Sequence, residues 1–409
     1  MKNTTSNNAS KKNLALITGI GIHSCLATNI EDYAAALREG RCGLHHDAAR
    51  LAAGFQSDLC GNVPQVEDEQ LGDLSRTQRQ CLSLPARYAL SAVRQALEYA
   101  AVSEEYLHTK NVSLIVSNDS SAEAFTQTLR TMRENNDTRT LGSGAAFRSI
   151  ASTASMNLAS ILGIHGLSLT MSAACAGGGH ALGLAKSLLE SGQSDMVIVV
   201  GTQETAIPAL CAFDALGVFS PDCVRPFGKG RNGLAPSGGA ACVILERALT
   251  RFNRNKRIKP LGMLSGYGFS TNGSEISTPS AAMEAQAMSN AIVSAGGEMP
   301  DVVLAHATGT PLGDAAEADA ICQAVQSAPR VVATKGMTGH ECWMSGVSQA
   351  VQAALFLRDG FLPAAVGTDE CEDERLNLVT KTEGYAPERI LCNAFGFGGT
   401  NASYVISKY

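Results

Sequence analysis

Short apolar runs alternate with amphipathic stretches along most of the chain. The apolar runs have the length of buried strands and cover residues 14–18, 112–119, 195–204, 238–246, 301–307, 330–336 and 402–407. The stretches between them repeat apolar residues at helical spacing and cover residues 29–39, 80–101, 177–191, 281–295, 314–326 and 345–358. Valine and isoleucine fill 195–204 almost without interruption, which is typical of a strand covered on both faces. The alternation predicts an α/β fold with largely buried sheets.

Composition supports a compact enzyme. The chain has 409 residues, 45% of them hydrophobic and 17% charged, so it can bury a large core and is not expected to be disordered. The net charge is -6 and no run of lysine and arginine stands out, which argues against nucleic acid as a partner. No apolar stretch is long enough for a membrane helix. Residues 1–12 are polar and predict a disordered tail rather than a signal peptide, so we expect a cytoplasmic protein.

The twelve cysteines show no CxxC pair and no spacing typical of metal ligands. We therefore expect neither a disulfide framework nor a structural metal site. Most of these cysteines are predicted to be small buried residues in a reducing compartment.

Two features suggest how the chain is organised. Residues 220–237 are rich in glycine and proline and predict a long functional loop. A basic stretch near 250–260 suggests a boundary close to 255, which would separate 13–255 from 256–409. Near the N-terminus, Gly19-Ile20-Gly21 is expected to end the first strand, and Ser24 stands where a dinucleotide-binding fingerprint would need glycine.

Four stretches carry candidate chemistry. Cys175 lies among small residues at the turn into a predicted helix, where free amides and the helix dipole favour a thiolate. His306 follows a strand and is succeeded by two threonines, and a histidine there can donate a hydrogen bond or move a proton. Lys335 closes another predicted strand, and His340 stands at a glycine turn before a helix. The glycines of 393–405 allow a bend whose amides can bind an oxyanion.

In this order, with "GTPLGD", "TKGMTGH" and "FGFGGTN", these stretches resemble the elongating β-ketoacyl-ACP synthases of type I/II, within the thiolase-fold condensing enzymes. The resemblance covers nearly the whole chain, from "ITGIGIHS" through "FDALGVFS" and "RPFGKGRNG". It implies a five-layered α/β/α/β/α thiolase fold with two similar halves, a dimer, and an acyltransferase of the 3-oxoacyl-ACP synthase type.

The resemblance also assigns roles. Cys175 matches the nucleophile that takes the acyl chain, and His306 and His340 match the pair that supports decarboxylation of malonyl-ACP. Lys335 and Glu317 match a buried pair that orients the site. The amides of Cys175 and Phe397 match the donors to an oxyanion, and the Phe397 side chain matches a gate. Thr308 and Thr310 match the threonines that bind the pantetheine arm.

The family's prosthetic group is phosphopantetheine carried by an acyl carrier protein, so no bound metal or redox cofactor is implied. The carrier is acidic, as is this chain, and a local basic patch would have to dock it. Arg76 and Arg79 fall where the family has basic docking residues.

The segment after His340 departs from the family pattern of small residues, because it reads Glu-Cys-Trp-Met-Ser over 341–345. On a helix starting near His340, Trp343 and Met344 would share its face and bind substrate or alter a subunit contact. The alternative is that Trp343 and Met344 only fill the core, with neighbouring residues compensating for their size. Smaller departures are Ala307 for a glycine, Gly228 for an aspartate, and Ser237-Gly238 for Gly-Glu.

This segment looks most like the ketosynthases of bacterial aryl polyene pathways, which often pair with a chain-length factor of the same fold. The alternatives are a primary fatty-acid elongating synthase, a CoA-dependent thiolase-like enzyme, and a non-catalytic chain-length factor. The last should have lost the nucleophile or the histidine pair, and this chain keeps all three residues. A homodimer and a heterodimer both remain open.

Overall fold

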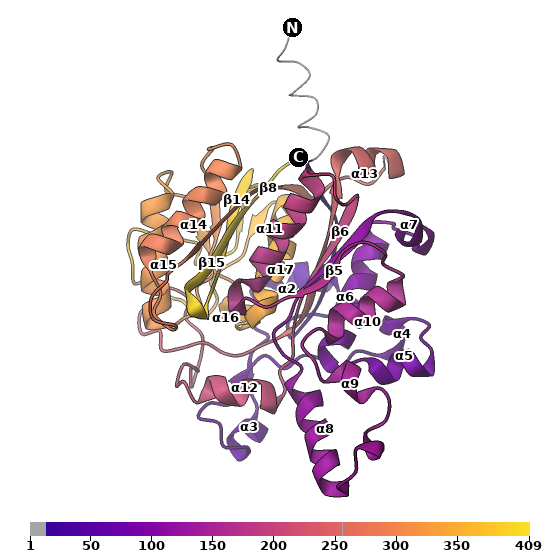
Figure 1. Cartoon of the computed structure of the whole chain (residues 1–409). Coiled ribbons are helices and arrows are strands. Elements are labelled where there is room, and N and C mark those ends of the chain that lie inside the picture. Colours follow the sequence, from indigo (N-terminus) through magenta and orange to yellow (C-terminus); the bar gives the residue numbers. More distant parts are fainter. Residues whose placement is uncertain (1–13, 256) are drawn as a thin grey trace.

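The computed structural model describes residues 14–255 and 257–409 (Figure 1). Its main sheet has the strand order β12-β10-β9-β14-β15-β8-β1-β7-β6-β4-β5. The bounds of these strands, in chain order, are β1 Ala15–Ser24, β4 Val112–Ser117, β5 Ser168–Met171, β6 Met196–Gln203, β7 Gly239–Arg247, β8 Gly262–Thr271, β9 Val302–Leu304, β10 Arg330–Val332, β12 Asn377–Leu378, β14 Arg389–Gly396 and β15 Thr400–Ser407. Two small sheets pair β2 (His45–His46) with β3 (Leu59–Cys60) and β11 (Phe361–Leu362) with β13 (Glu383–Gly384).

The main sheet joins two halves of the chain through a short contact. β1 pairs antiparallel with β8 where Leu16 faces Met263 and Ile17 faces Gly262. Strands of the first half lie on one side of this contact and strands of the second half on the other. The predicted boundary near 255 falls between β7 and β8 in the chain, beside a residue outside the described ranges.

The helices form three layers around these two half-sheets. α11 (Gly177–Glu190) and α17 (Ser345–Asp359) lie between them, since α11 packs on β6 and β15 and α17 packs on β7 and β14. α6 (Leu84–Tyr99) and α10 (Thr153–Leu162) cover the first half, while α14 (Ala281–Ser294) and α15 (Pro311–Ala324) cover the second (Figure 1). The predicted α/β/α/β/α layering is confirmed.

The remaining helices are mostly short. They are α2 Ile30–Glu39, α3 Ala48–Ala52, α4 Asp68–Leu71, α5 Arg76–Cys81, α7 Glu104–Thr109, α8 Ala122–Asn135, α9 Ala145–Arg148, α12 Ile207–Asp214, α13 Ala248–Arg254 and α16 Lys335–Thr338. Short 3₁₀ turns are η1 Thr138–Leu141, η2 Ala174–Ala176, η3 Cys342–Met344 and η4 Phe397–Gly399. In the described part of the chain, no helix is both long and apolar enough to cross a membrane.

The first strand is longer than the sequence predicts. Gly19 and Gly21 do not end β1, which continues to Ser24. A Cβ atom at Gly21 would lie 1.9 Å from the carbonyl oxygen of Ala92, and one at Gly19 would lie 2.3 Å from that of Ala96. These glycines therefore let α6 pack closely on the strand instead of forming a turn.

Other sequence predictions need correction. The predicted helix over 80–101 is two helices, because Ser83 caps α6 and Pro85 stands in its first turn. The helix after His340 begins at Ser345, since the left-handed backbone of Cys342 (φ 45°) interrupts it. Cysteines are less buried than predicted: Cys42 and Cys211 are exposed, and all twelve are free thiols. The tail predicted over 1–12 lies outside the described residues.

Candidate active site

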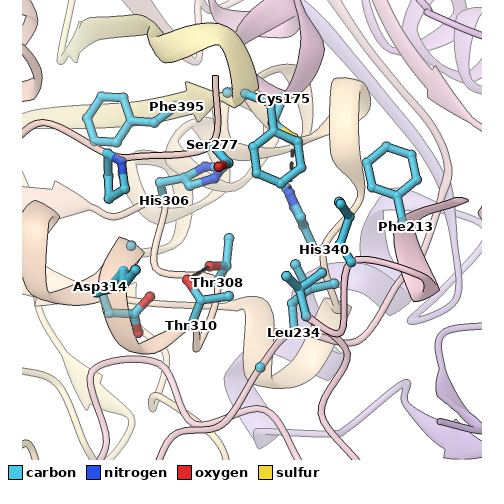
Figure 2. A pocket seen from close by; sticks show the side chains of 18 of the residues that line it. Cys175, Phe213, Leu234, Ser277, His306, Thr308, Thr310, Asp314, His340 and Phe395 are labelled. Carbon is cyan, nitrogen blue, oxygen red and sulfur yellow. Dashed lines mark hydrogen bonds between the residues drawn. The ribbon is translucent and has the colours of Figure 1, made fainter. Parts of the chain in front are cut away.

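A cavity of about 590 Å³ lies where the two halves meet (Figure 2). Cys175, His306 and His340 line it together, although they come from distant parts of the chain. Its wall also contains Thr308, Thr310, Glu317 and Phe397. These seven sequence-predicted residues thus share one cavity, whereas Lys335, Trp343, Met344, Arg76 and Arg79 are not among its lining residues. The described residues show no cluster that could hold a metal ion.

Cys175 sits in the turn η2, directly before α11. Its side chain is buried with 7% exposed. The preceding Ala174 has a left-handed backbone (φ 47°), which makes the sharp turn into the helix. A thiolate here is stabilised by the positive end of the α11 dipole.

His340 contacts Cys175 directly. Its Nε2 atom lies 3.1 Å from the sulfur, and its Nδ1 atom lies 3.4 Å from the Ser345 hydroxyl. The pKa of Cys175 is held well below its ordinary value by a hydrogen bond with Cys342 and by His340, against the opposing effect of burial. The arrangement favours ionisation of the Cys175 sulfur and places a histidine in contact with it.

His306 completes the group. It follows β9, and its ring lies nearly perpendicular to that of His340, with the centroids 5.2 Å apart. Burial lowers the pKa of His306 well below its usual value, and Lys335 and His340 add to this effect. Its Nδ1 atom has no hydrogen-bond partner among the described residues. A neutral imidazole in this position can donate one hydrogen bond to a substrate or accept one from it.

Lys335 and Glu317 hold the main chain of His306 from two sides. The Lys335 ammonium donates to the carbonyl of His306. The Glu317 carboxylate accepts from the amide of His306 at 2.8 Å and from that of Ala307 at 2.7 Å, and Asn393 donates to it at 3.0 Å. The two charged groups therefore act on the same peptide segment. Lys335 starts α16 rather than closing a strand as predicted, because β10 ends at Val332.

Comparison with known proteins agrees with this geometry. The β-ketoacyl synthase N-terminal domain matches residues 15–251, and the C-terminal domain of the same family matches residues 261–369. The chain belongs to the β-ketoacyl synthase family. It is therefore an acyltransferase that catalyses condensation.

Relatives of this β-ketoacyl synthase align over almost its whole length. The 3-oxoacyl-[acyl-carrier-protein] synthase 1 of Escherichia coli (strain K12) is 31% identical over 96% of this chain and 98% of its own. The 3-oxoacyl-[acyl-carrier-protein] synthase 2 of Vibrio harveyi is 26% identical over 97% of this chain and 99% of its own. The solved ishigamide ketosynthase/chain length factor matches with a TM-score of 0.90 and 26% identity over 97% of this chain and 99% of that one. These matches confirm the predicted family and fold.

Two threonines and an aromatic pair stand out among the residues that line the synthase cavity. The hydroxyl oxygens of Thr308 and Thr310 lie 3.0 Å apart. Phe397, in η4, is 40% exposed and stacks on Phe213 of α12 with ring centroids 6.4 Å apart. Figure 2 shows Phe213 facing the same space as Cys175 and His340.

Trp343 and Met344 do not line the cavity, contrary to the prediction that they contact substrate. Met344 is fully buried in the core, where a Cβ atom at Gly201 of β6 would come within 2.8 Å of its Cα atom. Trp343 is 5% exposed and packs behind Phe213 with the centroids 6.2 Å apart. The prediction assumed a helix from His340, whereas η3 turns these side chains in other directions.

Arg76 and Arg79 lie on α5 and not on the cavity wall. Arg76 is exposed, while Arg79 forms an ion pair with Asp68 at 3.0 Å.

Sequence reasoning missed several residues that shape the site. The glycine-rich and proline-rich loop over 220–237 positions His340 through two main-chain hydrogen bonds. The amide of His340 donates to the carbonyl of Ala235 at 2.7 Å, and the amide of Ser237 donates to the carbonyl of His340 at 3.0 Å. Cys342 and Glu284 both line the cavity. The glycine and proline content of the loop could have indicated its contact with His340. Neither Cys342 nor Glu284 belongs to a motif, so the sequence gives no such indication for them.

Proposed function

We propose that Cys175 takes an acyl chain from an acyl carrier protein as a thioester. The proposal is supported chiefly by the 3.1 Å contact between the His340 Nε2 atom and the Cys175 sulfur. The position before α11 and the lowered pKa of Cys175 favour the thiolate that this step needs. The thiolate attacks the carbonyl carbon of the acyl-carrier thioester, the bond from that carbon to the carrier sulfur breaks, and the carrier leaves as the phosphopantetheine thiolate, which takes a proton from water.

His306 and His340 then support the second half-reaction. Malonyl-carrier loses carbon dioxide, and the electron pair of the broken bond forms an enolate whose oxygen accepts hydrogen bonds from the two imidazoles. The enolate carbon attacks the thioester on Cys175. The tetrahedral intermediate collapses, Cys175 leaves as the thiolate, and the product is a β-ketoacyl-carrier two carbons longer.

The remaining roles concern binding and positioning. Lys335 and Glu317 fix the His306 peptide and touch no reacting atom in this scheme. The amides of Cys175 and Phe397 would receive the oxyanion, which is consistent with Gly396 lying next to η2: a Cβ atom there would be 3.0 Å from the Cys175 nitrogen. Removing one such donor typically costs about 10²–10³-fold in rate. Phe397 would act as a gate, and Thr308 with Thr310 would bind the pantetheine arm.

The carrier protein supplies the phosphopantetheine, and no separate cofactor is needed. Arg76 would contribute to docking the acidic carrier, and Arg79 would do so less because Asp68 already neutralises it. Carrier binding should then weaken with added salt.

We place the enzyme in aryl polyene biosynthesis. The segment "TKGMTGHECWMSG" supports this assignment. The likeness to the ishigamide ketosynthase/chain length factor supports pairing with a chain-length factor. Phe213 and Phe397, which both line the cavity and stack on each other, are also suited to a flat, conjugated chain, because aromatic rings pack favourably on one another. Primary fatty-acid elongation is the second candidate, favoured by 31% identity to the Escherichia coli synthase 1.

A competition assay separates the two functions. The protein would be given malonyl-ACP with equal amounts of an aryl-polyenoyl-ACP and a saturated acyl-ACP of similar length. Preferential extension of the conjugated chain supports the aryl polyene role. Equal or better extension of the saturated chain supports fatty-acid elongation instead.

We further propose that the enzyme is a dimer built along β5. This strand is the edge of the main sheet, and exposed edges tend to pair. Two exposed apolar side chains adjoin it: Leu167, which directly precedes β5, and Met156 of α10, a helix that packs on β5. Light scattering of the protein alone, and then with a candidate chain-length factor, distinguishes a homodimer from a heterodimer. A monomer under both conditions would contradict the proposal.

A further inference from the structure

Glu284 is a buried acid in the wall of the synthase cavity. It lies in the first turn of α14, lines the cavity and is 3% exposed. Its Oε2 atom has no hydrogen-bond partner among the described residues. The other carboxyls of this wall, Glu317 and Asp314, differ because each accepts hydrogen bonds from main-chain amides. A buried polar atom without a partner costs free energy, so we expect Glu284 to find its partner in a ligand.

The surroundings of Glu284 favour its neutral form. Burial raises the pKa of Glu284 to about 8, and the charge of Glu317 adds to the effect. Glu317 belongs to α15, which packs against α14, and a like charge opposes ionisation. At neutral pH the side chain is therefore a carboxylic acid, with one hydrogen to donate and an oxygen that can accept.

The elements that pack on α14 are β8, β14, β15 and α15. β8, β15 and the rest of α14 contain no Asp, Glu, Lys or Arg. Arg389 at the start of β14 is paired with Glu298, and α15 adds only the acids Asp314 and Asp319 to Glu317. The titratable groups of the three strands that stay neutral, because burial raises the pKa of each, are Tyr267, Cys392 and Tyr404. These packed elements therefore offer Glu284 no free cation.

Glu284 lies beside the path expected for the pantetheine arm. Thr310 is the N-cap residue of α15, Thr308 lies two residues earlier, and both line the cavity. Ile276 also lines the cavity ahead of α14 and is 75% exposed, so this wall reaches the surface. An arm that runs from the surface past the two threonines to Cys175 would pass along the starts of both helices.

We propose that Glu284, as a neutral acid, forms a pair of hydrogen bonds with a secondary amide of the phosphopantetheine arm. Its O–H donates to the amide carbonyl, and its carbonyl oxygen accepts from the amide N–H. A hydrocarbon acyl chain offers no partner for either group, and Glu317 disfavours the malonyl carboxylate beside Glu284. The proposal rests on the proposed function in taking the arm past Thr308 and Thr310. Arm binding then depends on pH, since an ionised Glu284 can no longer donate.

The test is the binding of S-ethyl pantetheine to the full-length protein, measured by saturation-transfer NMR at about pH 6.5 and about pH 9. This thioether carries the amides of the arm and cannot acylate Cys175. The wild type should bind it at least about fivefold more weakly at the higher pH, the order expected for one lost hydrogen bond. Glu284→Gln keeps a donor and an acceptor and should bind equally at both pH values. Glu284→Met keeps the size of the side chain and should bind weakly at both.

Two controls locate the contact. Glu98→Met, which changes an exposed glutamate of α6 outside the cavity, should behave as the wild type. A pantetheine analogue with esters in place of its amides lacks the N–H groups, and with it the wild type should lose most of its advantage over Glu284→Met.

The proposal is overturned if the wild type does not bind the thioether, binds it equally at both pH values, or binds it no better than folded Glu284→Met. An undiminished effect of Glu284→Met on the ester analogue also overturns it, because the contact then lies elsewhere on the ligand. Binding of a thioether needs no acyl transfer. Its result is therefore separate from acyl loading of Cys175, which tests the proposed function itself.

Discussion

The Nε2 atom of His340 lies 3.1 Å from the Cys175 sulfur, although the two residues are 165 positions apart in the chain. The contact depends on the close approach of α11 and α17, the helices that follow them. A Cβ atom at Gly346 would lie 2.4 Å from the Gly179 nitrogen, and one at Gly178 would lie 2.8 Å from the Val347 nitrogen. Glycine at these positions lets the two helix starts meet and brings the histidine to the sulfur.

Gly346→Ala should therefore separate the two helices and impair the site. The added methyl group meets main-chain atoms that cannot move aside, so we expect destabilisation of about 1–3 kcal/mol and a large loss of condensing activity. Thermal unfolding and turnover would be measured together. Gly384→Ala is the matched control, since a Cβ atom there meets nothing within 4 Å. Normal turnover in Gly346→Ala would show that the contact tolerates displacement.

The two half-reactions should separate in His306→Ala. The hydrogen-bond partner of the Cys175 sulfur is His340 and not His306, and we assign His306 to malonyl decarboxylation. We expect acyl loading of Cys175 to continue while decarboxylation falls by about 10²–10⁴-fold. Release of labelled carbon dioxide from malonyl-ACP measures the second step. Loss of loading with normal decarboxylation would contradict the assignment.

Trp343 should influence product length or starter choice through Phe213, against which it packs. Trp343→Gly removes that support and should alter the distribution of products, at a cost of about 3–5 kcal/mol in stability. Trp343→Phe is the milder variant, because the Trp343 Nε1 atom has no partner among the described residues. Products would be compared by liquid chromatography and mass spectrometry. An unaltered distribution in both variants would mean that Trp343 serves packing alone.

Stability should fall as pH rises towards 8. Burial raises the pKa of Glu284 from 4.5 to about 8, and the nearby charge of Glu317 adds to the effect. The folded protein then binds a proton that the unfolded chain has released, so unfolding becomes easier as pH rises through this window. Asp314 and Glu341, whose pKa values burial raises to about 7, contribute in the same direction.

Glu284→Gln isolates the contribution of Glu284. The variant should gain roughly 1 kcal/mol or more over the wild type at pH 8 and lose that advantage near pH 5. Differential scanning calorimetry at both pH values measures the difference. An equal difference at the two pH values would indicate that Glu284 does not titrate as described.

The main site residues could be predicted from the sequence because they lie in motifs. Cys175, His306 and His340 each stand in a short stretch with glycine or threonine neighbours, and those stretches carried the resemblance. The strands β8 and β14 were not predicted. β8 contains Gly266 and Gly268, which resemble turn signals in sequence but lie under α14: a Cβ atom at Gly266 would be 2.2 Å from the Ala291 carbonyl oxygen.

The surroundings of the site could not be predicted in the same way. The placement of Trp343 depends on the left-handed backbone of Cys342, and nothing in the local pattern indicates a left-handed cysteine. Glu284 lies on a helix whose other buried residues are apolar, so its position in the cavity wall depends on tertiary packing. These are contacts between segments far apart in sequence, which periodicity does not reveal.

Intact-mass spectrometry of the protein after incubation with acyl-ACP tests most directly whether Cys175 is the nucleophile. The wild type should gain the mass of one acyl group, and Cys175→Ala should gain none. Peptide mapping should place the acyl group on Cys175, and added malonyl-ACP should remove it. Equal acylation of the folded Cys175→Ala variant, or acylation at another cysteine, would contradict the account.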